Sequence, residues 1–242
     1  PTIMFLGFKL VEAFGIRSIL ARAVSAGVFT VLVDAPYGLT GPLPGVRWWE
    51  WLDWTIGGRH MFRYWYGWPM AEAIWQMTWP PLLMWLVWQW ERRRAATPAD
   101  IAAARRAPWV TLLGVPVLIG LLVNTGGMLL SFPIGIAIGL DLPHYPFVLA
   151  VAVLVCVVFL FADKRPVGLD RAGWTLLGIH VVGYGIITAA NFAARPVPAG
   201  QIVIVTLALT ALVVLACYAR YAARRVPDDA RAESRPSSRV VR

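Results

Sequence analysis

The residues best suited to chemistry are two acids placed in long apolar stretches. Asp34 closes the first long apolar segment, and Glu72 lies about eight residues into the second. At 1.5 Å per helical residue, Glu72 is about 12 Å along that helix. A carboxyl group at membrane depth is costly unless it is paired, protonated or facing a wet cavity, so both acids are candidate catalytic residues. Neighbouring indole rings suit a proton donor there, because their faces stabilise a developing cation.

Aromatic and polar side chains lie at helical spacings around these acids. Those three, four or seven residues from Glu72 are Trp65, Trp68, Pro69, Trp75, Gln76 and Trp79. One face of the fifth apolar segment carries His180, Tyr184, Thr188 and Asn191. This face could line the same interior, although polar side chains also hold membrane helices together. Glu72 could equally have a structural role, bonded to a neighbouring helix or paired with Arg59 or Arg63.

The sequence predicts no metal site and no cofactor. His60, His144 and His180 do not have metal-ligand spacing, and no Cys accompanies them. Cys156 and Cys217 each lie inside an apolar run, where a disulfide is not expected. No Gly-rich phosphate loop and no Gly-x-Ser-x-Gly elbow is present in the sequence.

Composition favours a membrane protein. Of the 242 residues, 59% are hydrophobic and only 14% are charged, whereas a soluble domain carries about a quarter charged residues. Six segments approach the roughly 20 apolar residues that a span needs: 17–35, 64–90, 108–131, 145–162, 173–193 and 200–222. A seventh, 1–15, is short, contains Lys9 and Glu12, and is either an interfacial helix or the end of a truncated span. We therefore predict an all-α integral membrane protein, a bundle of six transmembrane helices with a seventh short helix at 1–15.

The net charge of +9 fits one face of a membrane rather than nucleic acid. The outer loops hold only four basic residues, Arg47, Arg59, Arg63 and Arg195, and the others, Lys9 apart, gather on the opposite side. This places a multi-pass protein in the inner (plasma) membrane with its C-terminus in the cytoplasm. Residues 1–222 form one transmembrane domain, and 223–242 are predicted to be a disordered basic tail.

An outer connection, 36–63, is predicted between the first two spans. Together with the following helix it holds eleven of the thirteen Trp, from Trp48 to Trp90. Interfacial belts account for Trp at helix ends but not for Trp along a whole helix. We therefore predict a Trp-rich outer loop above the acids.

The stretch 31–92 resembles the AveC-type spiroketal cyclase family of bacterial membrane proteins. The motifs that carry the resemblance are Leu-Val-Asp at 32–34, Gly-Val-Arg-Trp at 45–48, Gly58, and Tyr-Gly-Trp-Pro-Met-Ala-Glu-Ala at 66–73, followed by the charged run 91–94. About a third of the chain is covered. The upstream Asp-Pro-x-x-Asn element and second Trp-rich loop of the family are not found, and its second acid has no counterpart in 34–38, which reads Asp-Ala-Pro-Tyr-Gly.

The resemblance implies acid-assisted closure of a spiroketal on a lipophilic, polyketide-like substrate through an oxocarbenium ion. Glu72 would be the acid and Asp34 its partner. The residues expected to contact the substrate are Trp48, Tyr66, Trp68, Trp75, Gln76, Asn124 and Tyr184. The expected partners are this substrate and the lipid bilayer, and the oligomeric state stays open.

Two other functions remain open at this point. A membrane-bound terpene cyclase uses the same residue types, a buried carboxyl and aromatic walls, to start and guide a carbocation. A non-enzymatic membrane subunit or small-solute transporter is the second alternative, although no internal repeat of the kind common in transporters is evident. The enzyme interpretation requires Asp34 and Glu72 to lie close together and Glu72 to face away from lipid.

Overall fold

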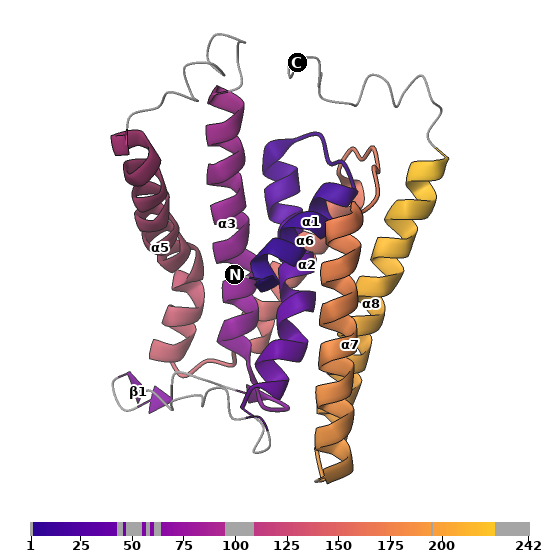
Figure 1. The fold of residues 1–242 in the computed structure, drawn as a ribbon. Helices are drawn as coiled ribbons and strands as arrows, with labels where there is room; N and C mark the ends of the chain where they lie inside the picture. The colour runs from indigo at the N-terminus through magenta and orange to yellow at the C-terminus, as the bar shows by residue number, and fades with distance from the viewer. Residues whose placement is uncertain are drawn as a thin grey trace.

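The computed structural model describes residues 2–42, 46, 55–56, 59–60, 64–94, 109–194 and 196–225. These residues form an all-helical bundle with two short hairpins (Figure 1). The helices are α1 (Thr2–Ala13), α2 (Ile19–Thr40), α3 (Met70–Arg94), α5 (Trp109–Gly139), α6 (Tyr145–Phe161), α7 (Arg171–Ala194) and α8 (Ala199–Arg224).

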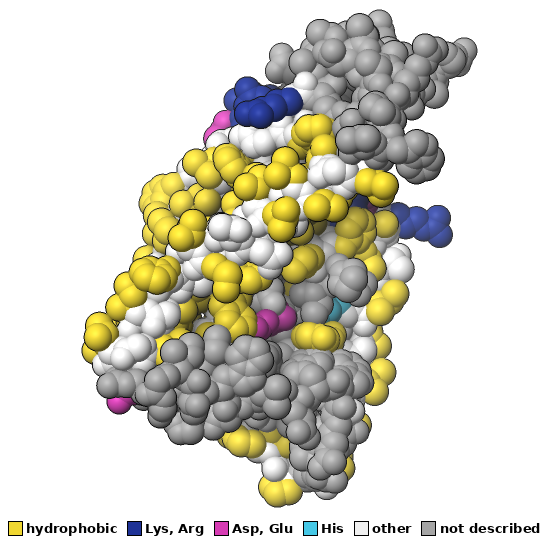
Figure 2. Space-filling view, turned by 90° about the vertical axis from the view of Figure 1, so that its left-hand side faces the viewer, with side chains coloured by type: hydrophobic (Ala, Val, Ile, Leu, Met, Phe, Trp, Pro, Cys, Tyr) yellow, Lys and Arg dark blue, Asp and Glu magenta, His cyan; other side chains and the backbone are white. Residues whose placement is uncertain are grey.

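The protein is a helical membrane protein. Four helices are long and apolar enough to cross a bilayer: α2, α5 from Leu113 onward, α7 and α8. The outward faces of α5 to α8 are lined by exposed Leu, Val, Ile and Phe, a surface that only lipid or another apolar partner would cover. Figure 2 shows this hydrophobic surface across the middle of the molecule, with Lys and Arg side chains in its upper part. We call the end that carries Arg17, Arg22, Arg92, Lys164, Arg165 and Arg220 the basic end.

The core is built around α2. This helix packs most extensively against α3 and also contacts α1, α6, α7 and α8. Near the basic end, Phe14 and Phe29 are fully buried and meet the Phe159 ring edge-on. Toward the other end, Trp68 and Met77 pack with residues of α2, α6 and α8. α2 thus forms the axis of the bundle, and its polar residues are shielded on most sides.

α1 is neither an isolated interfacial helix nor a loose end. Its buried face is made by Leu6, Leu10, Val11 and Ala13, which pack into the core. Gly7 sits so close to Thr30 of α2 that an added Cβ would lie 2.9 Å from a Thr30 methyl. The short apolar segment at 1–15 therefore belongs to the bundle.

Two antiparallel hairpins precede α3. Thr55–Ile56 (β1) pairs with Arg59–His60 (β2), and Tyr64–Trp65 (β3) pairs with Trp68–Pro69 (β4). The second hairpin turns at Tyr66 and Gly67, which have φ of 51° and 91°. Two successive positive φ values match the tight turns that suit hairpins, and Gly adopts them at little cost.

This hairpin corrects the predicted bounds of the second apolar segment. Residues 64–69 are not helical, and α3 begins only at Met70. The predicted end of the first span is also wrong, because α2 continues through Pro36 to Thr40. The third segment likewise continues to Gly139 rather than ending at 131. The tail 226–242 lies outside the described residues.

Candidate functional site

Asp34 is the most deeply buried acid in the described part of the chain. Its residue is 2% exposed, and it sits in α2 six residues before the helix ends. No described residue donates a hydrogen bond to its Oδ2 atom, and no described Lys, Arg or His forms a salt bridge with it. A buried carboxyl oxygen without a partner is rare and indicates a functional role.

Glu72 lies in the first turn of α3, two residues after the helix begins. It is therefore not about 12 Å along its helix, as the sequence alone predicted. Its side chain is half-buried, and Gln76 donates a hydrogen bond from Nε2 to Glu72 Oε1 at 2.8 Å. The Glu72 carboxyl is close enough to act electrostatically on Asp34. The two candidate acids are thus neighbours, which was the geometric requirement for the enzyme interpretation.

The indole of Trp68 lies against Asp34. Trp68 belongs to β4, not to the helix of Glu72, and reaches the acid because Gly38 has no side chain. A Cβ at Gly38 would lie 2.8 Å from Trp68 Nε1 and 3.5 Å from Asp34 Oδ2. The indole N–H approaches the Asp34 carboxyl without forming a well-aligned hydrogen bond, so the buried Nε1 has no partner among the described residues.

A row of aromatic rings connects α2 to α7 on the other side of Asp34. Tyr37 lies within electrostatic reach of Asp34, and its ring meets the edge of Tyr184 with centroids 6.4 Å apart. The Tyr184 ring lies 4.6 Å from the ring of His180, which hydrogen-bonds to the backbone of Val33. The polar face predicted on the fifth apolar segment therefore does point toward the acids.

Three buried polar atoms around the acid pair have no hydrogen-bond partner among the described residues: Asp34 Oδ2, Trp68 Nε1 and Gln76 Oε1. They include acceptors and one donor. Such a set suits the hydroxyl groups of a bound substrate, which both donate and accept. Figure 2 shows acidic and histidine side chains set among apolar ones in the lower half of the molecule.

Some of the expected substrate-contacting residues lie elsewhere. Asn124 is exposed on α5 and donates to the carbonyl oxygen of Gly120 in its own helix at 2.9 Å. Trp75 is on the side of α3 that packs with Ile134 and Ile138 of α5. Tyr66 is exposed at the hairpin turn, where its ring lies against Gly200 of α8.

Other predictions fall on residues that the structure does not describe. Trp48 lies outside the described residues, as does most of the predicted Trp-rich loop. The side chains of Arg59 and Arg63 lie outside them too. Within the described ranges, no three His, Cys, Asp or Glu side chains gather in a way that would hold a metal ion.

Three residues of the site were missed from the sequence: Thr30, Tyr37 and Gly38. Thr30 Oγ1 donates to the backbone oxygen of Gln76, and Tyr37 and Gly38 border Asp34 as described above. All three lie three or four residues from Asp34 and so on its side of α2. Helical spacing around Asp34, applied as it was around Glu72, could have found them.

Comparison of the chain with protein-family models, with curated proteins and with solved structures finds no match. The case for a function therefore depends on the geometry of the acid pair.

Proposed function

We propose that the protein is a membrane-embedded enzyme in which Glu72 and Asp34 act as a carboxyl pair to close a ring on a lipophilic substrate. The observation that supports this most is Asp34 itself. It is an almost fully buried carboxyl with an unpartnered oxygen, next to a second carboxyl and an indole. A purely structural acid in a membrane would be expected to have a cationic or hydrogen-bonding partner.

The ring closure that fits these groups best is spiroketal formation. In a substrate with a cyclic hemiketal and a free hydroxyl, Glu72 protonates the hemiketal hydroxyl, which leaves as water. The resulting oxocarbenium ion is attacked by the free hydroxyl, whose proton passes to Asp34. Proton exchange between the two adjacent carboxyls restores the starting state. The net change is the loss of one water, with no oxidant or cofactor required.

Aromatic side chains supply the remaining requirement, stabilisation of the cation. The Trp68 indole borders Asp34, and the Tyr37 and Tyr184 rings continue the wall toward α7. A cation over such faces gains about 2 kcal/mol or more when it is desolvated. A fixed wall also holds the flat oxocarbenium ion with one face toward the hydroxyl, which selects one stereoisomer.

We further propose that α3 and α6 span the membrane together with the four long apolar helices, giving six spans. The basic end would face the cytoplasm of a cell with an inner or plasma membrane, because basic residues concentrate on that side. The acid pair then lies toward the outer leaflet. Fusing a reporter after Arg225 that is active only in the cytoplasm would test this orientation.

The experiment for the activity uses membranes that contain the full chain and a polyketide-like dihydroxyketone. Spontaneous closure gives a mixture of stereoisomers, so chiral chromatography with mass detection measures the excess of one product. We expect Glu72→Gln and Asp34→Asn each to lower the enzymatic rate by about 10²-fold or more, which is typical for the loss of a general acid or base. Full turnover in both variants would sink the proposal.

Asp141→Asn is the matched control. Asp141 is an exposed acid at the same end of the bundle, and Asn tolerates its φ of 56°. This variant should keep wild-type activity and product ratio. A parallel incubation with a prenylated epoxide distinguishes the chemistry: turnover of the epoxide alone would replace the spiroketal by a terpene-type cyclisation.

A further inference from the structure

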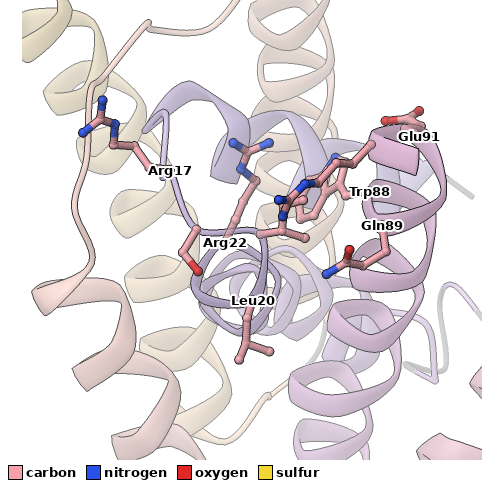
Figure 3. Close-up of a pocket in the computed structure, with 9 residues that line it drawn as sticks. Arg17, Leu20, Arg22, Trp88, Gln89 and Glu91 are labelled. Carbon is pink, nitrogen blue, oxygen red and sulfur yellow. The ribbon is translucent and has the colours of Figure 1, made fainter. Parts of the chain in front are cut away.

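A second pocket lies at the basic end, far along α2 and α3 from the acid pair. It has a volume of about 710 Å³ and is lined by Arg17, Ser18, Ile19, Leu20, Arg22, Trp88, Gln89, Glu91 and Arg92. Figure 3 shows it between the start of α2 and the end of α3. Three arginines and one glutamate leave it with an excess of positive charge. We propose that it binds the phosphate headgroup of an anionic phospholipid.

Arg22 is held ready for such a ligand. Its Nε and Nη2 donate to the carbonyl oxygen of Ile16 at 2.9 and 2.7 Å, and its guanidinium lies 5.1 Å from the ring centroid of the buried Trp88. A guanidinium has five N–H donors, so three remain for a phosphate. Because the side chain is already fixed, little conformational entropy is lost when an anion binds.

The start of α2 adds neutral donors. Ser18 caps the helix by accepting from the backbone N–H of Ala21, and Ile19 and Leu20 line the pocket in the first turn. The first amides of a helix have no partner within it, and they carry the positive end of the helix dipole. Phosphate groups bind such helix starts readily. Arginines and free amides thus converge on one pocket.

The surroundings favour a lipid over a free phosphate. Leu20 lines the pocket and is 61% exposed, so an apolar side chain stands beside the arginines. On the other side of Gln89, an apolar crevice of about 350 Å³ lies between α3 and α5, with Trp85, Leu118 and Leu122 in its walls. Gln89 lines both spaces. A phosphate in the first and an acyl chain in the second would satisfy both.

Opposing charges near the pocket are few. Glu91 lines it, and Glu12 of α1 acts electrostatically on the same region through Arg22 and Trp88. Arg17 is engaged by Asp163 at 3.3 Å, an exposed ion pair that a phosphate can replace at little cost. Arg92 is exposed and makes no hydrogen bond or ion pair with the described residues, so it is available to the ligand.

The test measures lipid binding by the purified, delipidated protein. Native mass spectrometry and thermal unfolding are recorded with phosphatidylglycerol, with phosphatidylcholine and with inorganic phosphate at equal concentration. We expect phosphatidylglycerol to be retained and to raise the unfolding temperature, and the other two to do neither. Equal binding of phosphatidylcholine would overturn the role of charge, and equal binding of inorganic phosphate would overturn the lipid.

Two variants and one control locate the site. Arg92→Gln, at an exposed position, should weaken phosphatidylglycerol binding about fivefold, and Arg22→Gln should do so at least as much. Arg171→Gln removes an exposed arginine at the same end but outside this pocket, and should change nothing. Unchanged affinity in Arg92→Gln, or an equal loss in Arg171→Gln, contradicts the proposal even if Arg22→Gln fails to fold.

Discussion

Thr30 of α2 donates a hydrogen bond to the backbone carbonyl oxygen of Gln76 in α3, with 2.5 Å between Oγ1 and the oxygen. Thr30 lies one turn before Asp34, and Gln76 lies one turn after Glu72. Since α2 and α3 run in opposite directions (Figure 1), both acids are displaced from this bond toward the same end of the bundle. The bond therefore sets the height of one acid relative to the other.

Thr30→Val tests this relationship. Valine has nearly the shape of threonine but no hydroxyl, so the interhelical bond is lost while the packing is kept. Net hydrogen bonds contribute about 1 kcal/mol to stability, and we expect a destabilisation of that size in thermal unfolding. Ring closure should fall further, by about 10-fold, because the catalytic groups lose their relative position.

Thr78→Val is the control for that variant. Thr78 of α3 donates to the carbonyl oxygen of Ile74 in its own helix at 2.8 Å. Its loss should affect stability to a similar or smaller extent and leave the rate of ring closure unchanged. If the two valine variants lower activity equally, the Thr30 bond has no special role in positioning the acids.

Gly38→Ala addresses the contact between Trp68 and Asp34. The new methyl group would lie 2.8 Å from Trp68 Nε1, too close for either group to stay in place. Alanine is otherwise favoured over glycine in a helix by up to about 1 kcal/mol, so stability should fall little. The stereoisomer excess and the rate should both fall, since the displaced indole no longer walls the site.

The comparison variant for Gly38→Ala is Gly183→Ala in α7. A Cβ there meets nothing within 4 Å, so the substitution adds the same methyl group in open space. Product ratio and rate should match the wild type. Retention of both in Gly38→Ala as well would show that the position of the Trp68 indole is unimportant for the reaction.

The sequence predicted the helices well because runs of apolar residues have few other structures available in a bilayer. It located their ends poorly, because local turn chemistry decides them. The pair Tyr66-Gly67 turns a hairpin where an apolar run suggested helix. Conversely, Pro36 is accommodated inside α2 although the predicted span ended before it.

The same two errors affected the candidate site. Glu72 is closer to the start of its helix than predicted, and Asp34 is farther from the end of its own. The errors compensate, so the predicted pair does form. Asn124 could not be excluded from the sequence, because the lipid-facing and inward-facing sides of α5 are almost equally apolar. Which side faces inward depends on packing between distant segments.

Gly15→Ala tests the joint between α1 and the loop after α6. Gly15 has a φ of +57°, and a Cβ there would overlap the carbonyl oxygen of Arg165, whose own N–H donates to the Gly15 oxygen at 3.1 Å. Backbone strain of this kind costs about 1–3 kcal/mol, and the overlap adds to it. We expect a markedly lower unfolding temperature. Gly120→Ala, in open space on α5, should leave it unchanged.

Asp170 joins the start of α7 to α1 through an ion pair whose pH dependence can be measured. Lys9 Nζ donates to Asp170 Oδ2 at 2.7 Å, and this bond, then the Gly173 N–H, holds the pKa of Asp170 below its ordinary 3.8. An acid with a lowered pKa stabilises the folded state above its unfolded pKa and loses that effect as the pH falls through its folded value. The same bond raises the pKa of Lys9 above its ordinary 10.5, so the Lys9 contribution persists until alkaline pH.

The measurement is the unfolding temperature of wild type and Asp170→Asn across pH. Asn keeps the cap to the Gly173 N–H but not the charge. We expect a small deficit near neutral pH, since the Asp170 side chain is 53% exposed, shrinking as the pH falls below 3.8 and also with added salt. Asp163→Asn, which removes the longer and more exposed pair with Arg17, should show almost none. A deficit in Asp170→Asn that stays constant into the acid range would mean that the ion pair does not stabilise this joint.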